Sequence, residues 1–263
     1  MAARAPRAAA LRPYVSRLWA GHADRARREH VVPSGEMHLA VRIDGPPLRL
    51  YAGRADREGR AVATAVACGA HSRYYAKRAE PGRTVGALLL PGAAQALLGV
   101  SAAALAERHV PLRVFWGPAV DGLRRALAAA ATPEAGLDAF ERALLAQLRP
   151  ADPLPAPLAR AIAGLDRDGD LDAALATAGW SRRHFIARFR DAAGLAPKRY
   201  ARLRRFQRVL ARIGDAAADW SALASEHGYC DQAHLARDFR QFAGVPARAY
   251  QRGRLHPRHV RVG

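Results

Sequence analysis

The 263-residue chain contains only two cysteines, Cys68 and Cys230. Small secreted domains often depend on several disulfides, so two widely separated cysteines provide no disulfide framework and are typical of a reducing compartment. The chain also lacks a run of about 18 apolar residues, the minimum for a membrane-spanning helix. Residues 1–10 are rich in Ala and Arg and have no apolar segment like that of a signal peptide. We therefore expect a cytoplasmic protein with no membrane partner.

Metal-binding spacings are absent as well, because the sequence contains neither Cys-x-x-Cys nor His-x-His. Cys68 stands in Ala-Cys-Gly-Ala-His, without the cysteine cluster of a metal-activated nucleophile. The histidines of the first half are scattered, and they would act as metal ligands only if the fold gathered them. They are His22, His30, His38, His71 and His109. We expect structural histidines, no catalytic residue, no cofactor and no metal site, and therefore no enzyme.

What the chain does contain is a pattern that occurs twice near its end, in residues 181–190 and 231–240. His, an apolar residue, Phe and Arg occur at the same offsets in both copies. Each copy is followed by Ala-Gly and then by a Tyr, Tyr200 or Tyr250, six residues after that Gly. Solenoids need at least three stacked units, so two copies indicate a paired module.

Each copy has the pattern of a helix-turn-helix unit. Apolar residues recur at helical spacing in residues 171–178, the pair Gly179-Trp180 interrupts them, and Ser181 is placed to cap a new helix. In the second copy Gly228 is the break and Asp231 the cap. A short turn containing Gly packs two helices at a steep angle and leaves the second one free to enter a major groove. A plain helical hairpin would give the same pattern in one copy, but the repetition and the charge favour DNA binding.

The charge is clustered in the second half of the chain. The formal net charge is +19, and residues 1–150 and 151–263 are equally basic, so the total alone locates no partner. Residues 181–212, however, hold eleven basic side chains and a single acidic one, Asp191. Such a cluster is expected where a protein binds a polyanion such as DNA. A solvated helix face or an acidic membrane surface would give a similar count.

Several short motifs lie at fixed places in this half. They are Gly-Trp-Ser at 179–181, His-Phe-x-x-x-Phe-Arg from His184, Gly-Leu-Ala-Pro at 194–197 and Gly-Tyr-Cys-Asp-Gln-Ala-His-Leu at 228–235. With them, residues 158–252 resemble the AraC/XylS-type transcription regulators. The family usually has Pro three residues after the final Gly, whereas here Pro246 follows Gly244 by two. The resemblance implies an all-α double helix-turn-helix domain that binds double-stranded DNA.

The helical pattern assigns faces to the two reading helices. Burying Phe185 and Phe189 leaves one set of side chains outward on the first, and burying Leu235 and Phe239 leaves another on the second. The helix between them, residues 197–213, spans about 25 Å at ~1.5 Å per residue, which suits reading helices in successive major grooves. The candidate DNA-binding residues are Arg182, Arg183, Ile186, Ala187, Arg190, Gln232, Ala233, Arg237 and Arg240.

The resemblance implies base contacts for two trios within this set. They are Arg183, Ile186 and Ala187 on the first helix, and Gln232, Ala233 and Arg237 on the second. Arg is the usual bidentate partner of guanine, Gln suits adenine, and small apolar side chains contact the thymine methyl. Arg190 and Arg240, one turn further on, are better placed for phosphates. His184 and His234 are expected to pack beside the turns.

The first half has a mixed pattern. Strands are predicted at 37–43, 48–52, 61–68 and 85–90, and helices at 93–98, 102–108, 119–131 and 135–148. These elements predict two domains, an α+β amino-terminal domain (a small β-barrel or sandwich plus helices) at 1–149 and an all-α DNA-binding domain at 158–263. A Pro-rich linker at 150–157 separates them.

The amino-terminal half also contains Tyr14-Val15 with Trp19, the run Pro-Ser-Gly-Glu-Met-His-Leu at 33–39, and Trp116-Gly117. With these residues it resembles the uncharacterised domain that precedes the same DNA-binding domain in many bacterial regulators. That resemblance implies a role in sensing an effector or in assembly.

Three functions compete. The favoured one is a sequence-specific transcription regulator, with RNA polymerase, a small-molecule effector and a second copy of the chain as further candidate partners. A nonspecific nucleic-acid-binding protein is the first alternative, supported by the Arg excess alone. An amino-terminal enzyme fused to a DNA-binding domain is the other, and the sequence offers it no catalytic constellation.

Overall fold

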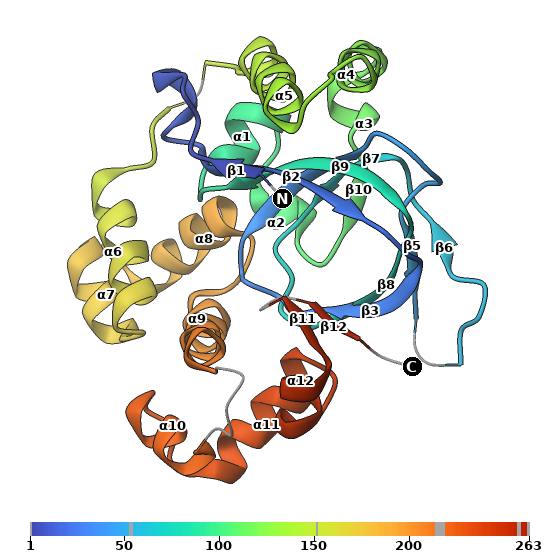
Figure 1. Cartoon of the computed structure of the whole chain (residues 1–263). Helices are drawn as coiled ribbons and strands as arrows, with labels where there is room; N and C mark the ends of the chain where they lie inside the picture. The colour runs from blue at the N-terminus through green and yellow to red at the C-terminus, as the bar shows by residue number, and fades with distance from the viewer. Residues whose placement is uncertain (1, 53–54, 151, 214–218, 257–258, 262–263) are drawn as a thin grey trace.

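The computed structural model describes residues 2–52, 55–150, 152–213, 219–256 and 259–261. Two antiparallel six-stranded sheets form the centre of the amino-terminal half (Figure 1). The first contains, in spatial order, β1 (Ala2–Arg4), β2 (Val15–Ala23), β9 (Gly82–Leu89), β4 (Met37–Arg42), β7 (Ala65–Cys68) and β10 (His109–Pro111). The second contains β11 (Arg254–His256), β12 (His259–Arg261), β3 (Arg27–Val31), β8 (Tyr75–Ala79), β5 (Arg49–Tyr51) and β6 (Arg60–Ala61). Within the described residues no ladder joins the two sheets, so they resemble a sandwich more than a closed barrel.

The first sheet follows the alternation expected of a half-buried strand. Met37, Leu39 and Val41 of β4 are buried, and the residues between them are half-buried. β7 lies between β4 and β10, and all four of its residues are buried. β9 passes so close to β2 that a Cβ at Gly86 would lie 2.3 Å from the ring of Trp19. Glycine is therefore required at that point of the sheet.

The second sheet contains a buried carboxylate at its centre. Glu29 of β3 lies directly opposite Lys77 of β8, its side chain is 2 % exposed, and it forms ion pairs with Lys77 (3.2 Å) and Arg27 (3.3 Å). His259 of β12 adds a 2.7 Å hydrogen bond between its Nδ1 and Glu29 Oε1. Burial alone would raise the pKa of Glu29, but the His259 hydrogen bond and the Lys77 charge lower it to about 2. Charged residues thus form strands here because they neutralise one another.

The amino-terminal half also contains several helices. They are α1 (Ala93–Leu98), α2 (Ala102–Leu105), α3 (Arg113–Trp116), α4 (Ala119–Ala128) and α5 (Pro133–Gln147), after a 3-10 turn at Ala9–Leu11. α5 packs on β2 and β9, as the upper part of Figure 1 shows. Arg4 of β1 fixes this contact through ion pairs of 2.6 Å with both Asp138 and Glu141.

The second half of the chain is helical as far as residue 253. Its helices are α6 (Ala156–Arg167), α7 (Leu171–Ala178), α8 (Arg182–Ala193), α9 (Pro197–Arg212), α10 (Trp220–Glu226), α11 (Gln232–Phe242) and α12 (Ala247–Gly253). The predicted breaks at Gly179 and Gly228 both have a left-handed φ, 66° and 70°. The predicted caps are confirmed, because Ser181 Oγ accepts from the His184 N–H and the Asp231 carboxylate from the His234 N–H. Residues 214–218, between α9 and α10, lie outside the described residues.

The last strands were not indicated by the sequence. β11 and β12 form a hairpin that pairs with β3, with Val260 opposite His30. Residues assigned by sequence to the all-α DNA-binding domain therefore extend the second sheet of the amino-terminal domain (Figure 1). The Pro-rich segment is also shorter than predicted, because α6 already begins at Ala156. Pro is well tolerated in a first helical turn, which allows this early start.

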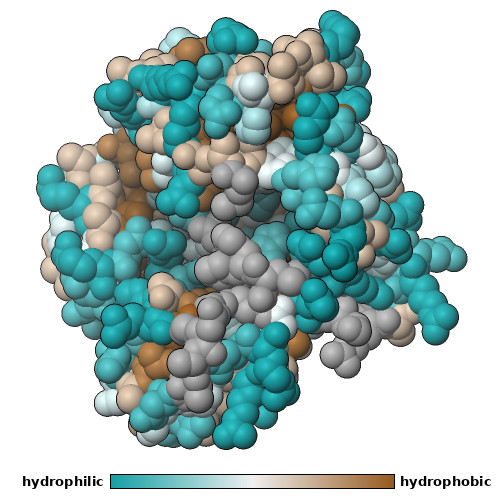
Figure 2. Space-filling view, viewed as in Figure 1, coloured by the Kyte–Doolittle hydropathy of each residue, from teal (hydrophilic) through white to brown (hydrophobic). Residues whose placement is uncertain are grey.

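The two halves are connected by direct hydrogen bonds. The Gly92 N–H donates to Ala192 O (2.9 Å), and the Gln207 side chain donates to Pro33 O (2.6 Å). On the face drawn in Figure 2, hydrophilic residues predominate and apolar ones occupy small separate areas. In the described part of the chain, no helix combines the length and apolar character needed to cross a membrane.

Candidate nucleic-acid interface

The first reading helix, α8, is anchored by its aromatic face. Phe185 and Phe189 are fully buried, with ring centroids 5.7 Å apart, and Phe189 packs edge-on against Tyr200 of α9 at 5.3 Å. Phe185, Phe189 and Tyr200, which belong to the repeated sequence pattern, therefore pack together in one hydrophobic core. This packing turns the opposite face of α8 outward.

The predicted contact residues of α8 lie on that outward face. Arg182, Arg183, Ala187 and Arg190 are exposed, and Ile186 is half-buried. These exposures hold with the amino-terminal domain in place. The domain contacts the carboxyl end of α8 and leaves its amino-terminal turns, where major-groove readers make most base contacts, open to solvent.

The second reading helix, α11, is built on the same plan. Leu235 and Phe239 are buried, and Phe239 contacts three aromatic rings. Its ring centroid lies 4.9 Å from Phe206, 5.5 Å from Trp220 and 5.5 Å from Tyr250. The predicted contact residues Gln232, Ala233, Arg237 and Arg240 are all exposed. Both sets of candidate residues therefore face solvent from helices whose other faces are fixed.

A buried ion pair, which the sequence did not indicate, fixes α11 to α9. The Asp238 side chain is 0 % exposed, and its Oδ1 accepts from Arg202 Nε at 2.9 Å. Its other oxygen accepts from the Tyr229 hydroxyl at 2.9 Å. Because Tyr229 follows the turn and Arg202 lies on the connecting helix, the carboxylate holds three elements in one arrangement.

The basic cluster at 181–212 divides into two groups. Five of its members, all on α9, hydrogen-bond to protein groups: Arg199, Arg202, Arg204, Arg205 and Arg208. The others are exposed, and none has a partner among the described residues: Arg182, Arg183, Arg188, Arg190, Lys198 and Arg212. The sequence count therefore overstates the charge available to phosphates, because these five arginines of α9 already bond to protein groups.

The histidines of the two repeats lie beside their turns, as expected. His184 is exposed and packs edge-on against Trp180, with ring centroids 4.9 Å apart. His234 is half-buried and meets Tyr229 in the same way at 5.0 Å. Each ring covers the aromatic residue that follows the glycine of its turn.

The amino-terminal histidines are less scattered than the sequence suggested. His71 and His109 lie with Cys68 in one cluster, whose ligand atoms are all within 4.8 Å of one another. His30 lies elsewhere, with Nδ1 2.9 Å from Ala243 O, and His22 is 3.4 Å from Asp24. Sequence spacing could not reveal the cluster, because His109 joins it only through the pairing of β10 with β7.

One cavity lies beside the outer face of the first sheet. It has a volume of about 240 Å³ and is lined by His22, Arg83, Leu127 and Thr132 among others. Drug-sized ligands generally occupy pockets of about 300–1,000 Å³. The volume of this cavity lies below that range, so the cavity does not indicate which class of effector would bind.

Comparison with known proteins finds two family models, each of which matches a part of the chain. The family model of a helix-turn-helix domain, of the AraC type, matches residues 175–253. A domain of unknown function, DUF6597, matches residues 4–111. No curated protein matches the sequence.

Solved structures of ToxT from Vibrio cholerae are similar over most of the chain. One at 1.65 Å resolution is 8 % identical and covers 89 % of this chain and 97 % of its own, with a TM-score of 0.47. A second contains (E)-4-(8-methylnaphthalen-1-yl)but-3-enoic acid, with 8 % identity, the same 89 % of this chain, 98 % of its own and a TM-score of 0.46.

Proposed function

Because the chain belongs to the AraC/XylS-type transcription regulators, which bind DNA, we propose that it is sequence-specific and reads two half-sites with α8 and α11. Arg183, Ile186 and Ala187 would contact bases in one major groove. Gln232, Ala233 and Arg237 would contact bases in the next. Arg182, Arg190 and Arg240 would bind phosphates and fix the register.

One observation carries the proposal. Both candidate faces are exposed in the full chain, while the helices behind them are held by an aromatic core and by the Asp238 ion pair. α9 has 16 residues, so it measures about 24 Å at ~1.5 Å per residue and can separate two helices that follow the same side of a duplex. Rigid presentation favours recognition of a defined spacing over nonspecific binding.

We further propose that the amino-terminal domain regulates the DNA-binding half. Hydrogen bonds and a shared sheet connect the two halves, so an effector or partner that prefers one arrangement of the domain would change the placement of the reading helices. A small-molecule effector, RNA polymerase and a second copy of the chain are the candidate inputs.

The base-reading roles are tested with Arg183→Ala and Arg237→Ala on a duplex that the full-length protein selects, and on single-base variants of it. Each substitution should relax preference in one half-site only and cost about 1–3 kcal/mol there. Arg188→Ala is the matched control: it removes an exposed arginine of α8 outside the predicted base contacts, so it should weaken all sequences alike. If Arg183→Ala and Arg237→Ala also weakened all sequences alike, the nonspecific alternative would replace the proposal.

A further inference from the structure

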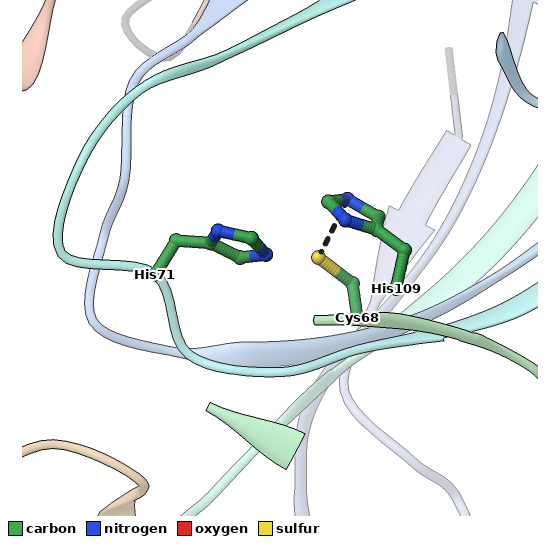
Figure 3. Close-up of side chains that lie close together, drawn as sticks. All are labelled: Cys68, His71 and His109. Carbon is green, nitrogen blue, oxygen red and sulfur yellow. Dashed lines mark hydrogen bonds between the residues drawn. The ribbon is translucent and has the colours of Figure 1, made fainter. Parts of the chain in front are cut away.

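Three side chains with metal-binding atoms converge where the first sheet meets the loop after β7. Cys68 ends β7, and His109 lies directly opposite it on β10, with Nε2 3.2 Å from Cys68 Sγ. His71 follows in the loop, and its ring is directed at the cysteine sulfur (Figure 3). One thiol sulfur and two imidazole nitrogens, all within 4.8 Å of one another, form the cluster.

The His71 ring has one satisfied nitrogen and one unsatisfied nitrogen. Nδ1 lies 3.3 Å from Glu107 Oε2. Nε2 is buried and has no hydrogen-bond partner among the described residues, and the whole residue is 8 % exposed. A buried polar atom without a partner costs about 1–3 kcal/mol, so it requires an explanation. A carboxylate on one ring nitrogen with the other nitrogen free is the arrangement that orients metal-ligating histidines.

The residue that holds His71 has an uncommon backbone conformation. Glu107 has a left-handed φ of 60°, which is rare outside glycine and is concentrated at functional sites. Its carboxylate accepts from both the N–H and the hydroxyl of Ser72, and its own N–H donates to Ala70 O at 3.0 Å. Glu107 therefore fixes the residues on both sides of His71 as well as the ring itself.

A catalytic Cys–His pair does not explain the cluster. Cys68 is 1 % exposed, whereas a nucleophilic cysteine lies in partly exposed surroundings that a substrate can reach. Packing of neutral side chains does not explain the cluster either, because it leaves His71 Nε2 without a hydrogen-bond partner among the described residues.

We propose that Cys68 Sγ, His71 Nε2 and His109 Nε2 bind a divalent transition-metal ion of the zinc type, and that the loop at residues 70–74 transmits its binding to both helix-turn-helix units. Zinc takes four ligands from thiolate, imidazole and oxygen donors, at about 2.3 Å for sulfur and 2.0–2.1 Å for nitrogen. His38, opposite Cys68 on β4, is a further imidazole in the same cross-strand row. Binding converts the thiol into a metal-bound thiolate and releases its proton to solvent.

The geometry requires a small closing movement. Ligand atoms of a tetrahedral zinc site are about 3.3–3.6 Å apart, given those bond lengths, whereas the widest separation here reaches 4.8 Å. Cys68 and His109 lie on paired strands, so the adjustment falls on the loop of His71, together with the Glu107 carboxylate that holds its ring. The movement would be carried into the residues that follow His71.

Residues 70–74 contact both repeats at equivalent positions. A Cβ at Gly194 would lie 3.1 Å from the Ala70 Cβ, and one at Gly244 would lie 2.5 Å from the Tyr74 ring. Gly194 and Gly244 are the matching glycines that follow the two reading helices. Arg199 of α9 also donates to Ser72 Oγ at 3.3 Å. A shift of this loop therefore acts on both reading units, and this part of the inference rests on the proposed DNA-binding function.

The metal site is tested on the full-length protein freed of metal with a chelator. Zn²⁺ is titrated against a chromophoric chelator, and Co²⁺ reports tetrahedral geometry and a sulfur ligand by its visible and near-ultraviolet absorption. We expect one ion per chain, and at least about tenfold weaker binding in His71→Ala, His109→Ala and Cys68→Ser. Cys230→Ser and His22→Ala, which alter residues outside the cluster, should bind like the wild type.

Circular dichroism identifies unfolded variants, and His71→Gln replaces any that fail to fold. Absence of stoichiometric binding by the wild type, or an equal loss in the Cys230→Ser control, would overturn the site. Transmission is measured separately, as the DNA affinity with and without Zn²⁺. It should change at least threefold in the wild type and stay constant in His71→Ala. Equal affinities would overturn the transmission alone, and failure to bind DNA at all would overturn the proposed function while the Zn²⁺ titration still decides the site.

Discussion

The ion pair behind the second reading helix predicts an unequal response to its two partners. Asp238 is 0 % exposed, whereas the Arg202 side chain is 37 % exposed. Replacing Arg202 with Met keeps an apolar stem and removes the guanidinium, whose Cζ lies 5.3 Å from the centroid of the Phe242 ring. Among the described residues, the buried carboxylate then keeps the Tyr229 hydroxyl as its one side-chain partner. Replacing Asp238 with Asn instead leaves an arginine that can turn toward water.

The magnitudes follow from this difference in exposure. Breaking a fully buried pair costs about 3–5 kcal/mol, so a half-exposed arginine places Arg202→Met near the lower end, at about 3 kcal/mol. Asp238→Asn keeps its shape and a hydrogen bond with Tyr229, so we expect about 1 kcal/mol. In the double variant the neutral Asn does not require a positively charged partner. The double variant should therefore lose about 2 kcal/mol less stability than the sum of the losses in the two single variants.

The assay is urea denaturation of the full-length variants, read as the free energy of unfolding. Asp191→Asn is the matched control, because it neutralises an exposed carboxylate of the first reading helix and should change stability by less than about 0.5 kcal/mol. Additive single costs, or an Arg202→Met cost below about 1 kcal/mol, would show that the pair does not hold α11.

Three further predictions concern the interface between the halves and the charge. Gly244→Ala should destabilise more than Gly179→Ala in thermal denaturation: both have a left-handed φ, but only at Gly244 does a Cβ meet a ring, that of Tyr74, whereas Gly179 faces open space. Because the folded pKa of Glu29 is lowered to about 2, its contribution of about 3 kcal/mol is present above pH 4.5 and lost as the pH falls toward 2. In the Glu29→Gln variant, the free energy of unfolding should therefore change less between pH 4.5 and pH 2 than in the wild type. If about six exposed basic side chains meet phosphates, the logarithm of DNA affinity should fall with the logarithm of salt concentration at a slope near −5, and a slope shallower than −2 would contradict the electrostatic account.

The helical half could be predicted because its determinants are local. Glycines at the turns, Ser181 and Asp231 as caps, and Phe at four-residue spacing each act within one or two helical turns. The repetition then confirmed the pattern independently. The predicted DNA-contact residues lie on exposed faces for the same reason, because helical periodicity fixes which side is buried. Their contacts with bases stay a prediction.

The rest depends on contacts between residues distant in the chain. β3 and β8 contain charged residues, which are uncommon in strands, so the sequence pattern does not indicate these two strands. The charges are tolerated here because Glu29 and Lys77 pair across the ladder. The hairpin of β11 and β12 forms by addition to a sheet whose other strands lie over 170 residues earlier. The Cys68 cluster and the Asp238 ion pair likewise require that separate elements be placed first. Hydrophobic periodicity carries no information about such pairings.

The central claim is that one chain reads two different half-sites with two helices at a fixed spacing. Selection of binding sites from random duplex DNA by the full-length protein tests it most directly. The account predicts two blocks of specified base pairs, different in sequence, with centres about 10–10.5 base pairs apart, or one turn of DNA. A single block, two identical blocks in a palindrome, or no enrichment over the random pool would contradict it.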